Sequence, residues 1–151
     1  MIRKARLEDF DGIHKVFLEV HKFHLENAPH IFKDVDPVSL DEYMEMLEDE
    51  NRFIIVSDNN GIDGFLDATI KEKNSKTTGY KKQMFIEHLG VLKSTQKSGV
   101  GGALMEKAEK YAKEIGCTII TLDVWGFNHN AIGFYEHIGF DERTKKMHKF
   151  I

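Results

Sequence analysis

Apolar side chains recur along this chain with two periods, one typical of helices and the other of strands. Spacings of three and four residues predict helices over residues 9–25, from 39 onward, over 100–115 and over 128–137. Short β-rich runs predict strands over residues 2–6, 53–57, 62–71, 85–92 and 118–125. Residues 145–150 alternate weakly and can pair as a last strand. The chain is therefore expected to mix helices and strands along its whole length.

The start of the second predicted helix carries a three-part local signal. Ser39 and Glu42 form a capping box, and Val38 and Tyr43 stand in the hydrophobic-staple positions around it. Farther along, residues 72–82 are polar and basic, so they are expected to form a loop at a strand crossing.

Length and composition fit one compact domain over residues 1–151. Hydrophobic residues make up 41% of the chain and charged residues 30%, which is ordinary for a folded protein. The net charge of -4 gives no general attraction to nucleic acid or to an anionic membrane. No apolar stretch could span a bilayer, and the first residues lack the apolar core of a signal peptide. The only cysteine, Cys117, cannot form an internal disulfide, so a cytoplasmic location is expected.

The most informative segment is the glycine-rich junction at residues 96–102, which joins a predicted strand to a helix. Unpaired N–H groups at a helix start carry the positive end of the helix dipole, and glycines let a phosphate approach them closely. The junction is therefore predicted to bind a pyrophosphate. A P-loop is excluded because Gly102 is followed by Ala103 rather than lysine. A dinucleotide loop is excluded because Leu104 stands where a third glycine is needed.

The remaining pattern, Gln/Arg-x-x-Gly-x-Gly/Ala, is met by Gln96, Gly99 and Gly101. It resembles the acetyl-CoA loop of the GNAT superfamily of acyl-CoA N-acyltransferases. The family pattern downstream is Asn, two residues, Ala, two residues, Phe-Tyr, three residues and Gly-Phe, and residues 128–140 match it in register. Upstream, Leu89-x-Val91 precedes the loop. The resemblance is specific over residues 85–140 and holds in outline before that.

The resemblance implies a mixed α/β (α+β) fold, in which helices cover both faces of a twisted mixed sheet and the fourth and fifth strands splay apart. In this family the cofactor enters the gap between these two strands. The pantetheine arm of CoA is a chain of amides, so it can bind the edge of a strand at Leu89, Gly90 and Val91. Asn128 is a helix N-cap that is also expected to contact the cofactor. The junction residues expected to bind acetyl-CoA are Gln96, Lys97, Ser98, Gly99, Val100, Gly101 and Gly102.

Acetyl transfer to an amine needs a group that takes a proton and a group that serves the departing thiolate. An amine like that of lysine has a pKa of about 10.4, so it is mostly protonated at pH 7. Glu87 interrupts the apolar fourth strand and is the expected base, with a purely structural carboxylate as the alternative. His88 competes with it, because only one of the two should face the cleft unless a bulge intervenes. Tyr135 matches the family tyrosine that contacts the cofactor and serves the thiolate; the alternative is an aromatic residue of the core.

An acidic run on the second helix bears on the acceptor. Residues 41–50 hold six carboxylates, and the first basic residue after them is Arg52. A solvated acidic face explains this run, and a field that favours a cationic amine is the competing hypothesis. His24, His30 and Phe32 are candidates to shape the acceptor pocket.

These features together predict a function. The expected protein is an acetyl-CoA-dependent N-acetyltransferase that acts directly on a primary amine of a small molecule or peptide. The alternative is a CoA-binding sensor or partner-binding module without transferase activity. No metal is expected, because His21 and His24 lack the companions of a metal site. No partner beyond the amine is indicated, although the chain is free to form a homodimer.

Overall fold

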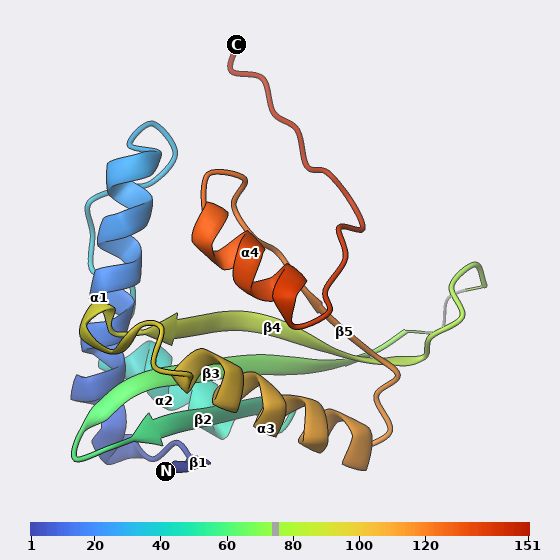
Figure 1. The fold of residues 1–151 in the computed structure, drawn as a ribbon, viewed down its shortest axis with the longest axis horizontal. Helices are drawn as coiled ribbons and strands as arrows, with labels where there is room; N and C mark the ends of the chain where they lie inside the picture. Colours follow the sequence, from blue (N-terminus) through green and yellow to red (C-terminus); the bar gives the residue numbers. More distant parts are fainter. Residues whose placement is uncertain (74–75) are drawn as a thin grey trace.

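A five-stranded sheet forms the centre of the protein in this computed structural model, which describes residues 1–73 and 76–151 (Figure 1). Asn74 and Ser75, inside the loop predicted at 72–82, lie outside the described residues. The strands follow the order β1-β2-β3-β4-β5; the first four are antiparallel neighbours and β5 runs parallel to β4, so the predicted mixed sheet is confirmed. The strands are β1 (Ile2–Lys4), β2 (Arg52–Asp58), β3 (Ile62–Glu72), β4 (Lys82–Val91) and β5 (Ile119–Leu122).

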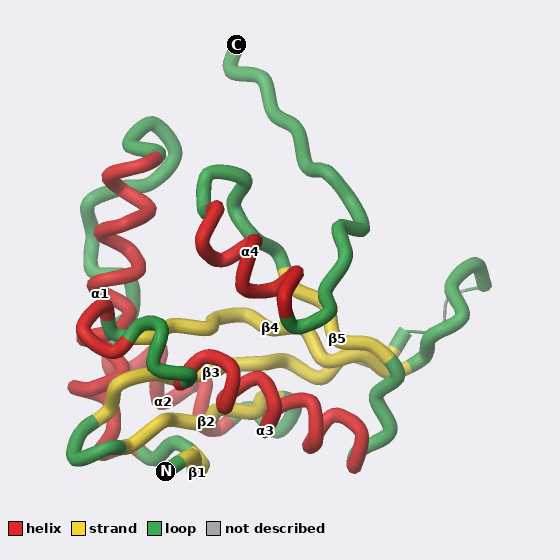
Figure 2. The backbone as a smooth tube through the Cα atoms, viewed as in Figure 1, coloured by secondary structure: helices red, strands yellow, loops and turns green. Residues whose placement is uncertain are grey.

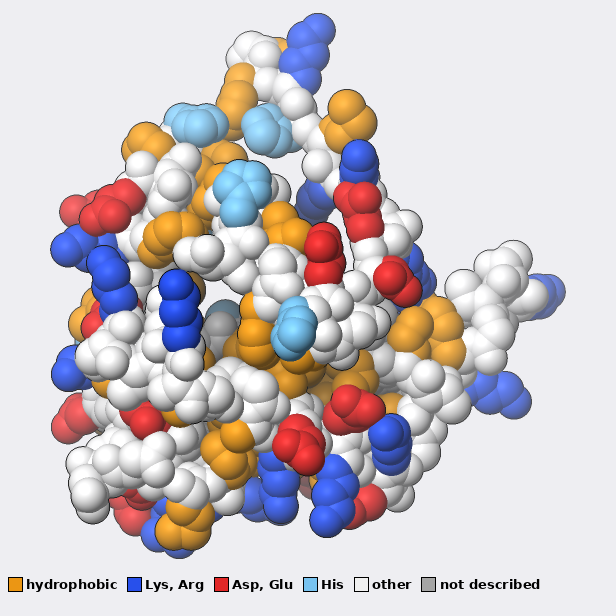
Figure 3. Space-filling model, in the orientation of Figure 1, with side chains coloured by type: hydrophobic (Ala, Val, Ile, Leu, Met, Phe, Trp, Pro, Cys, Tyr) orange, Lys and Arg blue, Asp and Glu red, His pale blue; other side chains and the backbone are white. Residues whose placement is uncertain are grey.

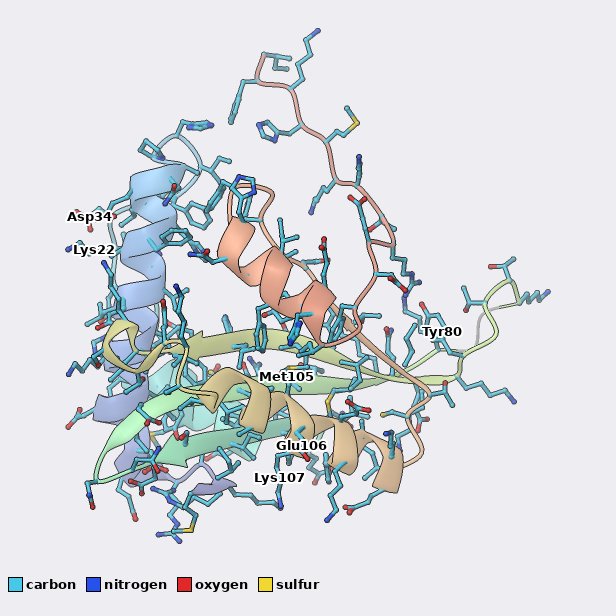
Figure 4. All side chains as sticks on the ribbon, viewed as in Figure 1. Lys22, Asp34, Tyr80, Met105, Glu106 and Lys107 are labelled. Atoms are coloured by element: carbon cyan, nitrogen blue, oxygen red, sulfur yellow. The ribbon has the colours of Figure 1, made fainter. Side chains whose placement is uncertain are left out.

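Helices cover both faces of this sheet, as expected (Figure 2). Helices α1 and α2 pack on one face with Phe65 of β3, and α3 packs on the other with the next residue, Leu66. Met105 points from α3 into the core, whereas its neighbours Glu106 and Lys107 are exposed (Figure 4). No helix in the described ranges is both long and apolar enough to cross a bilayer. The helices are α1 (Phe10–Asn27), α2 (Leu40–Glu48), α3 (Val100–Glu114) and α4 (His129–His137), with short 3-10 turns at Leu7–Asp9 and Lys93–Thr95.

The predicted start of the second helix is confirmed. Ser39 is the N-cap of α2, and its hydroxyl accepts a hydrogen bond from the N–H of Glu42 at 3.1 Å. Val38 and Tyr43 are both buried in the apolar cluster under α1 and α2. The Tyr43 hydroxyl also donates to the carbonyl of Arg6 at 2.7 Å. These contacts hold α2, with its acidic run, against the sheet.

The last strand predicted at residues 145–150 is wrong. Residues 141–151 extend away from the sheet, and none of their backbone groups bonds to the backbone of another described residue (Figure 1). Side-chain contacts hold the segment instead: Arg143 Nη2 donates to the Tyr80 hydroxyl at 2.6 Å, and the Phe150 ring lies 5.5 Å from the His30 ring. The segment is mostly charged, and its few apolar side chains stay exposed, so burial of apolar surface does not draw it onto the sheet of its own chain.

Candidate active site

The fourth and fifth strands splay apart and leave a gap beside β4. β5 pairs with β4 only at residues 83–86, so β4 has no described strand partner on that side over residues 87–91. The predicted pantetheine-binding residues Leu89, Gly90 and Val91 lie in this stretch. A strand edge without a partner offers its N–H and C=O groups to an extended ligand that carries amides.

The start of α3 presents free N–H groups beside an open space. The first helical hydrogen bond runs from Ala103 N–H to the Gly99 carbonyl at 3.0 Å, so the N–H groups just before Ala103 have no partner within the helix. Gly99 is the N-cap and has a φ of 90°, a left-handed conformation that glycine adopts without strain. A Cβ at Gly99 or Gly102 would meet nothing within 4 Å. This geometry suits a bound anion.

A side-chain hydrogen bond anchors the junction to the end of β4. Gln96 Nε2 donates to the carbonyl of Val91 at 3.4 Å, which brings the free N–H groups next to the free strand edge. Ser98 differs from the rest of the predicted pyrophosphate cradle, because its hydroxyl donates to the Thr95 carbonyl and its N–H bonds to the same oxygen at 3.3 Å. Lys97 is exposed, with a φ of 67°.

A β-bulge interrupts β4 at the two residues that compete as the base. Asp67 of β3 lies opposite His88, and the next residue, Ala68, lies opposite Ile86. Glu87 is therefore an extra residue on β4 without a counterpart on β3. A bulge of this kind breaks the alternation of side chains between the two faces of a strand.

The bulge places both candidate bases on one face of the sheet. The Thr69 hydroxyl donates to Glu87 Oε1 at 2.8 Å, and His88 Nδ1 lies 2.9 Å from Asp67 Oδ2. Asp67 and Thr69 are two apart on β3 and share a face, so their partners share it too. This is the face under α1, because the Phe17 ring meets the His88 ring edge-on at 4.8 Å. The sequence predicted that only one of Glu87 and His88 would face the cleft unless a bulge intervened. The structure contains that bulge, so both residues lie on the same face.

Asp67 is a buried carboxylate with hydrogen-bond partners on two neighbouring strands. Its side chain has no exposed surface, whereas that of His88 is 44% exposed. Arg52 donates to both oxygens of Asp67, from Nε at 2.7 Å and from Nη2 at 2.6 Å. Burial raises the pKa of Asp67, but the hydrogen bonds from Arg52 and His88 outweigh burial and hold that pKa below its usual value. Asp67 is therefore ionised at neutral pH.

A pocket of about 380 Å³ opens beside His88 and under α2. We call it the acidic pocket, because half of the carboxylates of the 41–50 run line it and the others do not. The positive charge of its one arginine is compensated by Asp67. Its charged and titratable lining consists of Glu42, Glu45, Asp49, Arg52 and His88. The pocket therefore favours a positively charged occupant.

The model of the acetyltransferase (GNAT) family matches residues 17–140, from the middle of α1 to three residues after the end of α4. The chain belongs to the GNAT acetyltransferase family. The resemblance noted from the loop and the downstream motif is thereby confirmed.

The fold and a short segment of the chain are also similar to those of individual proteins. The structure is similar to that of a tetramutant of the BH1408 protein of Bacillus halodurans, with a TM-score of 0.95, 21% identity, and coverage of 100% of this chain and 99% of that one. An aminoglycoside N-acetyltransferase, AAC(6')-Iy, solved in complex with CoA, gives a TM-score of 0.80 at 18% identity over 100% and 93% of the two chains. At these identities the similarity shows the fold alone. A 45-residue segment is 47% identical to an uncharacterized N-acetyltransferase of Methanocaldococcus jannaschii; it covers 30% of this chain and 20% of that protein.

In this member of the GNAT family, α4 and its N-cap carry the last two predicted site residues. Asn128 is the N-cap, and its Oδ1 accepts from the N–H of Ala131 at 3.2 Å. The partly buried ring of Tyr135 lies between the rings of Phe134 and Phe140, with centroids 5.4 and 5.6 Å away. Burial raises the pKa of Tyr135 to about 12, so the hydroxyl keeps its hydrogen at neutral pH. Cofactor contacts of both residues stay predictions.

An aromatic cluster that sequence reasoning largely missed bridges the end of α1 and the segment between β5 and α4. His24 stacks on Phe32 at 4.9 Å, Phe32 meets Trp125 at 4.9 Å, and Phe127 lies 5.9 Å from both His24 and Trp125. Burial, with contributions from His21 and His88, lowers the pKa of His24. Figure 3 shows histidine side chains gathered around this end of the molecule. His24 and Phe32 were predicted to shape the acceptor pocket together with His30; none of the three lines the acidic pocket, and their role toward an acceptor stays a prediction. The Trp-Gly-Phe sequence after β5 was the signal that pointed to Trp125 and Phe127.

Among the described residues, the gap holds neither a metal-binding cluster nor the cysteine. In the part of the chain that the structure describes, no three His, Cys, Asp or Glu side chains are arranged to hold a metal ion. Cys117 lies just before β5, at the end of the β4–β5 pairing away from the bulge, because the next residue bonds to the carbonyl of Lys82. Burial raises the pKa of the Cys117 thiol, which disfavours the nucleophilic thiolate.

Proposed function

We propose that this protein is an acetyl-CoA-dependent N-acetyltransferase that transfers the acetyl group directly to a primary amine of a small molecule or peptide. The observation that carries the proposal is the free edge of β4 beside the free N–H groups of α3, joined by the bond from Gln96 to Val91. A ligand with an amide chain at one end and a pyrophosphate at the other fits these two features. CoA has this chemistry, and the similar aminoglycoside N-acetyltransferase was solved in complex with CoA.

The residues around the gap supply the proton chemistry that direct transfer requires. When bound, acetyl-CoA supplies an acetyl group activated as a thioester. Glu87 and His88 lie on one face of the sheet and are the groups available to take a proton from the attacking amine. Tyr135 is proposed to donate a hydrogen bond to the departing thiolate. The position of Cys117 away from the bulge supports transfer without an acyl-enzyme.

The acidic pocket supports an acceptor that carries more than one positive charge. One amine must reach the acetyl group unprotonated, and a second, protonated amine would be attracted by the carboxylates of the pocket. Polyamines and aminoglycosides have this chemistry, and the similar AAC(6')-Iy protein is an aminoglycoside N-acetyltransferase.

The test measures acetyl-CoA binding by calorimetry and thiol release with a panel of polyamines, aminoglycosides and N-terminal peptides. Binding together with thiol release that depends on one of these amines is the expected result. Binding without turnover on any amine would favour the alternative, a CoA-binding sensor or partner-binding module. Absence of acetyl-CoA binding would contradict both.

We also propose a homodimer in which residues 141–151 of one copy pair with β5 of a second copy. This segment has no backbone partner among the described residues, and β5 lies at the edge of the sheet. Each chain therefore carries both an unpaired segment and a strand edge with which the segment of a second copy can pair. Light scattering should show a dimer for the full chain and a monomer after truncation at Phe140. A truncated chain that stays dimeric would contradict this pairing.

A further inference from the structure

We propose that His88 is the general base of the acetyl transfer and that Asp67 is the positioning residue that directs its free nitrogen to the acceptor. This inference rests on the proposed acetyltransferase function and goes beyond it, because it selects one base from the two on the bulge. It starts from the contact between His88 Nδ1 and Asp67 Oδ2 at 2.9 Å.

The contact with Asp67 sets the tautomer of the His88 ring. An ionised carboxylate can only accept hydrogen bonds, so the hydrogen between the two side chains belongs to Nδ1 of His88. In the neutral ring the other nitrogen, Nε2, then carries the lone pair. A base needs such a lone pair within reach of the proton that it takes.

The surroundings of the ring direct Nε2 away from the sheet. Nδ1 points to Asp67, which has no exposed surface, while the side chain of His88 is 44% exposed and lines the acidic pocket. The Phe17 ring packs edge-on against the imidazole at 4.8 Å and limits its rotation. An amine in the acidic pocket would therefore meet Nε2 of His88 and not the carboxylate behind it.

Arg52 keeps the Asp67 carboxylate ionised, so that it can hold the His88 ring. Its two hydrogen bonds, at 2.7 and 2.6 Å, compensate the buried negative charge, so Asp67 stays ionised and does not take the proton from His88. When Nε2 takes a proton from the amine, the imidazolium faces this carboxylate and is stabilised by it. The proton moves from the amine nitrogen to Nε2, and the lone pair that is freed on nitrogen forms the new bond to the acetyl carbon. The carbon–sulfur bond of the thioester breaks, and its electron pair leaves on the sulfur as the thiolate to which Tyr135 is proposed to donate a hydrogen bond.

Glu87 is less suited to the same role. It is partly buried, and its Oε1 already accepts the Thr69 hydroxyl at 2.8 Å. In general, an imidazole with a reference pKa of about 6.5 is better matched to neutral pH than a carboxylate at about 4.3. Thr69 therefore holds Glu87 beside β3, whereas Asp67 contacts only Nδ1 of His88 and leaves Nε2 free.

Charged and titratable groups face His88 from every element that packs near it. Asp67 and Arg52 approach from β3 and β2, and Glu87 is its neighbour on β4. His24 of α1 is electrostatically coupled to it. The remaining groups are the carboxylates of the acidic pocket. Carboxylates therefore outnumber the cationic groups around the ring.

The first test determines which nitrogen of the His88 ring carries the hydrogen. It uses nitrogen NMR of the full chain, with the His88 signals assigned by their loss in His88→Gln. At a pH where the ring is neutral, the hydrogen is expected on Nδ1. In Asp67→Asn the amide can donate to Nδ1, so the hydrogen is expected to move to Nε2. A neutral wild-type ring with its hydrogen on Nε2 would overturn the positioning role of Asp67. Because this result is read on the wild type, it does not depend on the folding of Asp67→Asn.

The second test compares kcat with the best amine of the panel across pH. His88→Gln is expected to lower kcat at least about 100-fold with an unchanged Kd for acetyl-CoA. Glu87→Gln is expected to lower kcat by a factor at least about ten times smaller than that of His88→Gln. His14→Gln is the matched control, since His14 also contacts an aspartate, Asp36 at 2.8 Å, but does not line the acidic pocket.

The outcomes separate this inference from the proposed function. A folded Asp67→Asn is expected to lose kcat and to change the acidic limb of the pH profile, because the ring would present N–H to the acceptor; the same carboxylate-to-amide change in a serine protease costs about 10⁴-fold. Glu87→Gln losing more activity than His88→Gln would overturn the assignment of the base. A wild type that turns over no amine would refute the proposed function, and the NMR result would still decide whether Asp67 sets the ring.

Discussion

Replacing Tyr135 with phenylalanine removes one hydroxyl from α4 and leaves the aromatic ring between Phe134 and Phe140. Because the packing is kept, the fold and the affinity for acetyl-CoA should change little. We expect kcat to fall about 10- to 150-fold, which corresponds to the loss of one hydrogen bond to a charged group at about 1.5–3 kcal/mol.

The raised pKa of Tyr135 sets the size of the expected fall in kcat. Burial brings it to about 12, whereas a reference thiol has a pKa of about 8.5, so full proton transfer from the phenol to the thiolate is unfavourable by about 3.5 pKa units, or about 5 kcal/mol. The hydroxyl can therefore stabilise the thiolate by donating a hydrogen bond while it keeps its proton. Full general acid catalysis would contribute about 10²–10⁴-fold, so the expected loss lies at the lower end of that range or below it.

The assay is single-turnover thiol release with the best amine, because acetyl transfer must limit the rate. Tyr111→Phe is the matched control: this tyrosine stacks on Phe53 at 4.1 Å on the α3 side of the sheet. A Tyr135→Phe rate within twofold of wild type would show that Tyr135 only packs or contacts the cofactor. A loss well above 10³-fold would refute the energetic argument, because it would require full proton transfer.

Three further predictions concern the phosphate site, the acceptor and the buried carboxylate. Gly102→Val should keep the melting temperature within a few degrees, since its Cβ meets nothing within 4 Å, but raise the calorimetric Kd for acetyl-CoA at least about tenfold; an unchanged Kd would contradict the site. Neutralising the three carboxylates of the acidic pocket should raise the KM for a polyamine about tenfold at low salt and less at high salt, with Glu48→Gln as the control; an equal effect on acetyl-CoA would indicate a damaged fold. Asp67→Ala should lower the free energy of unfolding at pH 7 by about 3–5 kcal/mol in urea titrations, because it leaves Arg52 without its partner. The folded state lowers the pKa of Asp67, so this contribution is present above about pH 4 and is lost as the pH falls through the folded pKa; a difference between variant and wild type that persists at the lowest pH would contradict the linkage.

Local sequence determined the elements and the family of this protein. The capping box at Ser39, the apolar stripe of α3 and the glycines of residues 96–102 act on neighbours within a few residues, so their effect can be predicted without the rest of the chain. The motif over residues 128–140 identified the family for the same reason, because its spacing is that of one N-capped helix. The strands were predicted with errors of a few residues at their ends, where pairing decides the length.

Only the tertiary structure decided how the candidate site is assembled. The bulge at Glu87 depends on the register between β3 and β4, and a register depends on contacts that periodicity does not encode. Asp67 is an ordinary acidic residue in the sequence, and it becomes the partner of Arg52 and His88 because three strands bring them together and burial removes competing water. The orientation of α2 likewise decided which carboxylates line the acidic pocket. Residues 141–151 stay unpaired within one copy, because a strand forms only where another strand offers it hydrogen bonds and an apolar surface to cover.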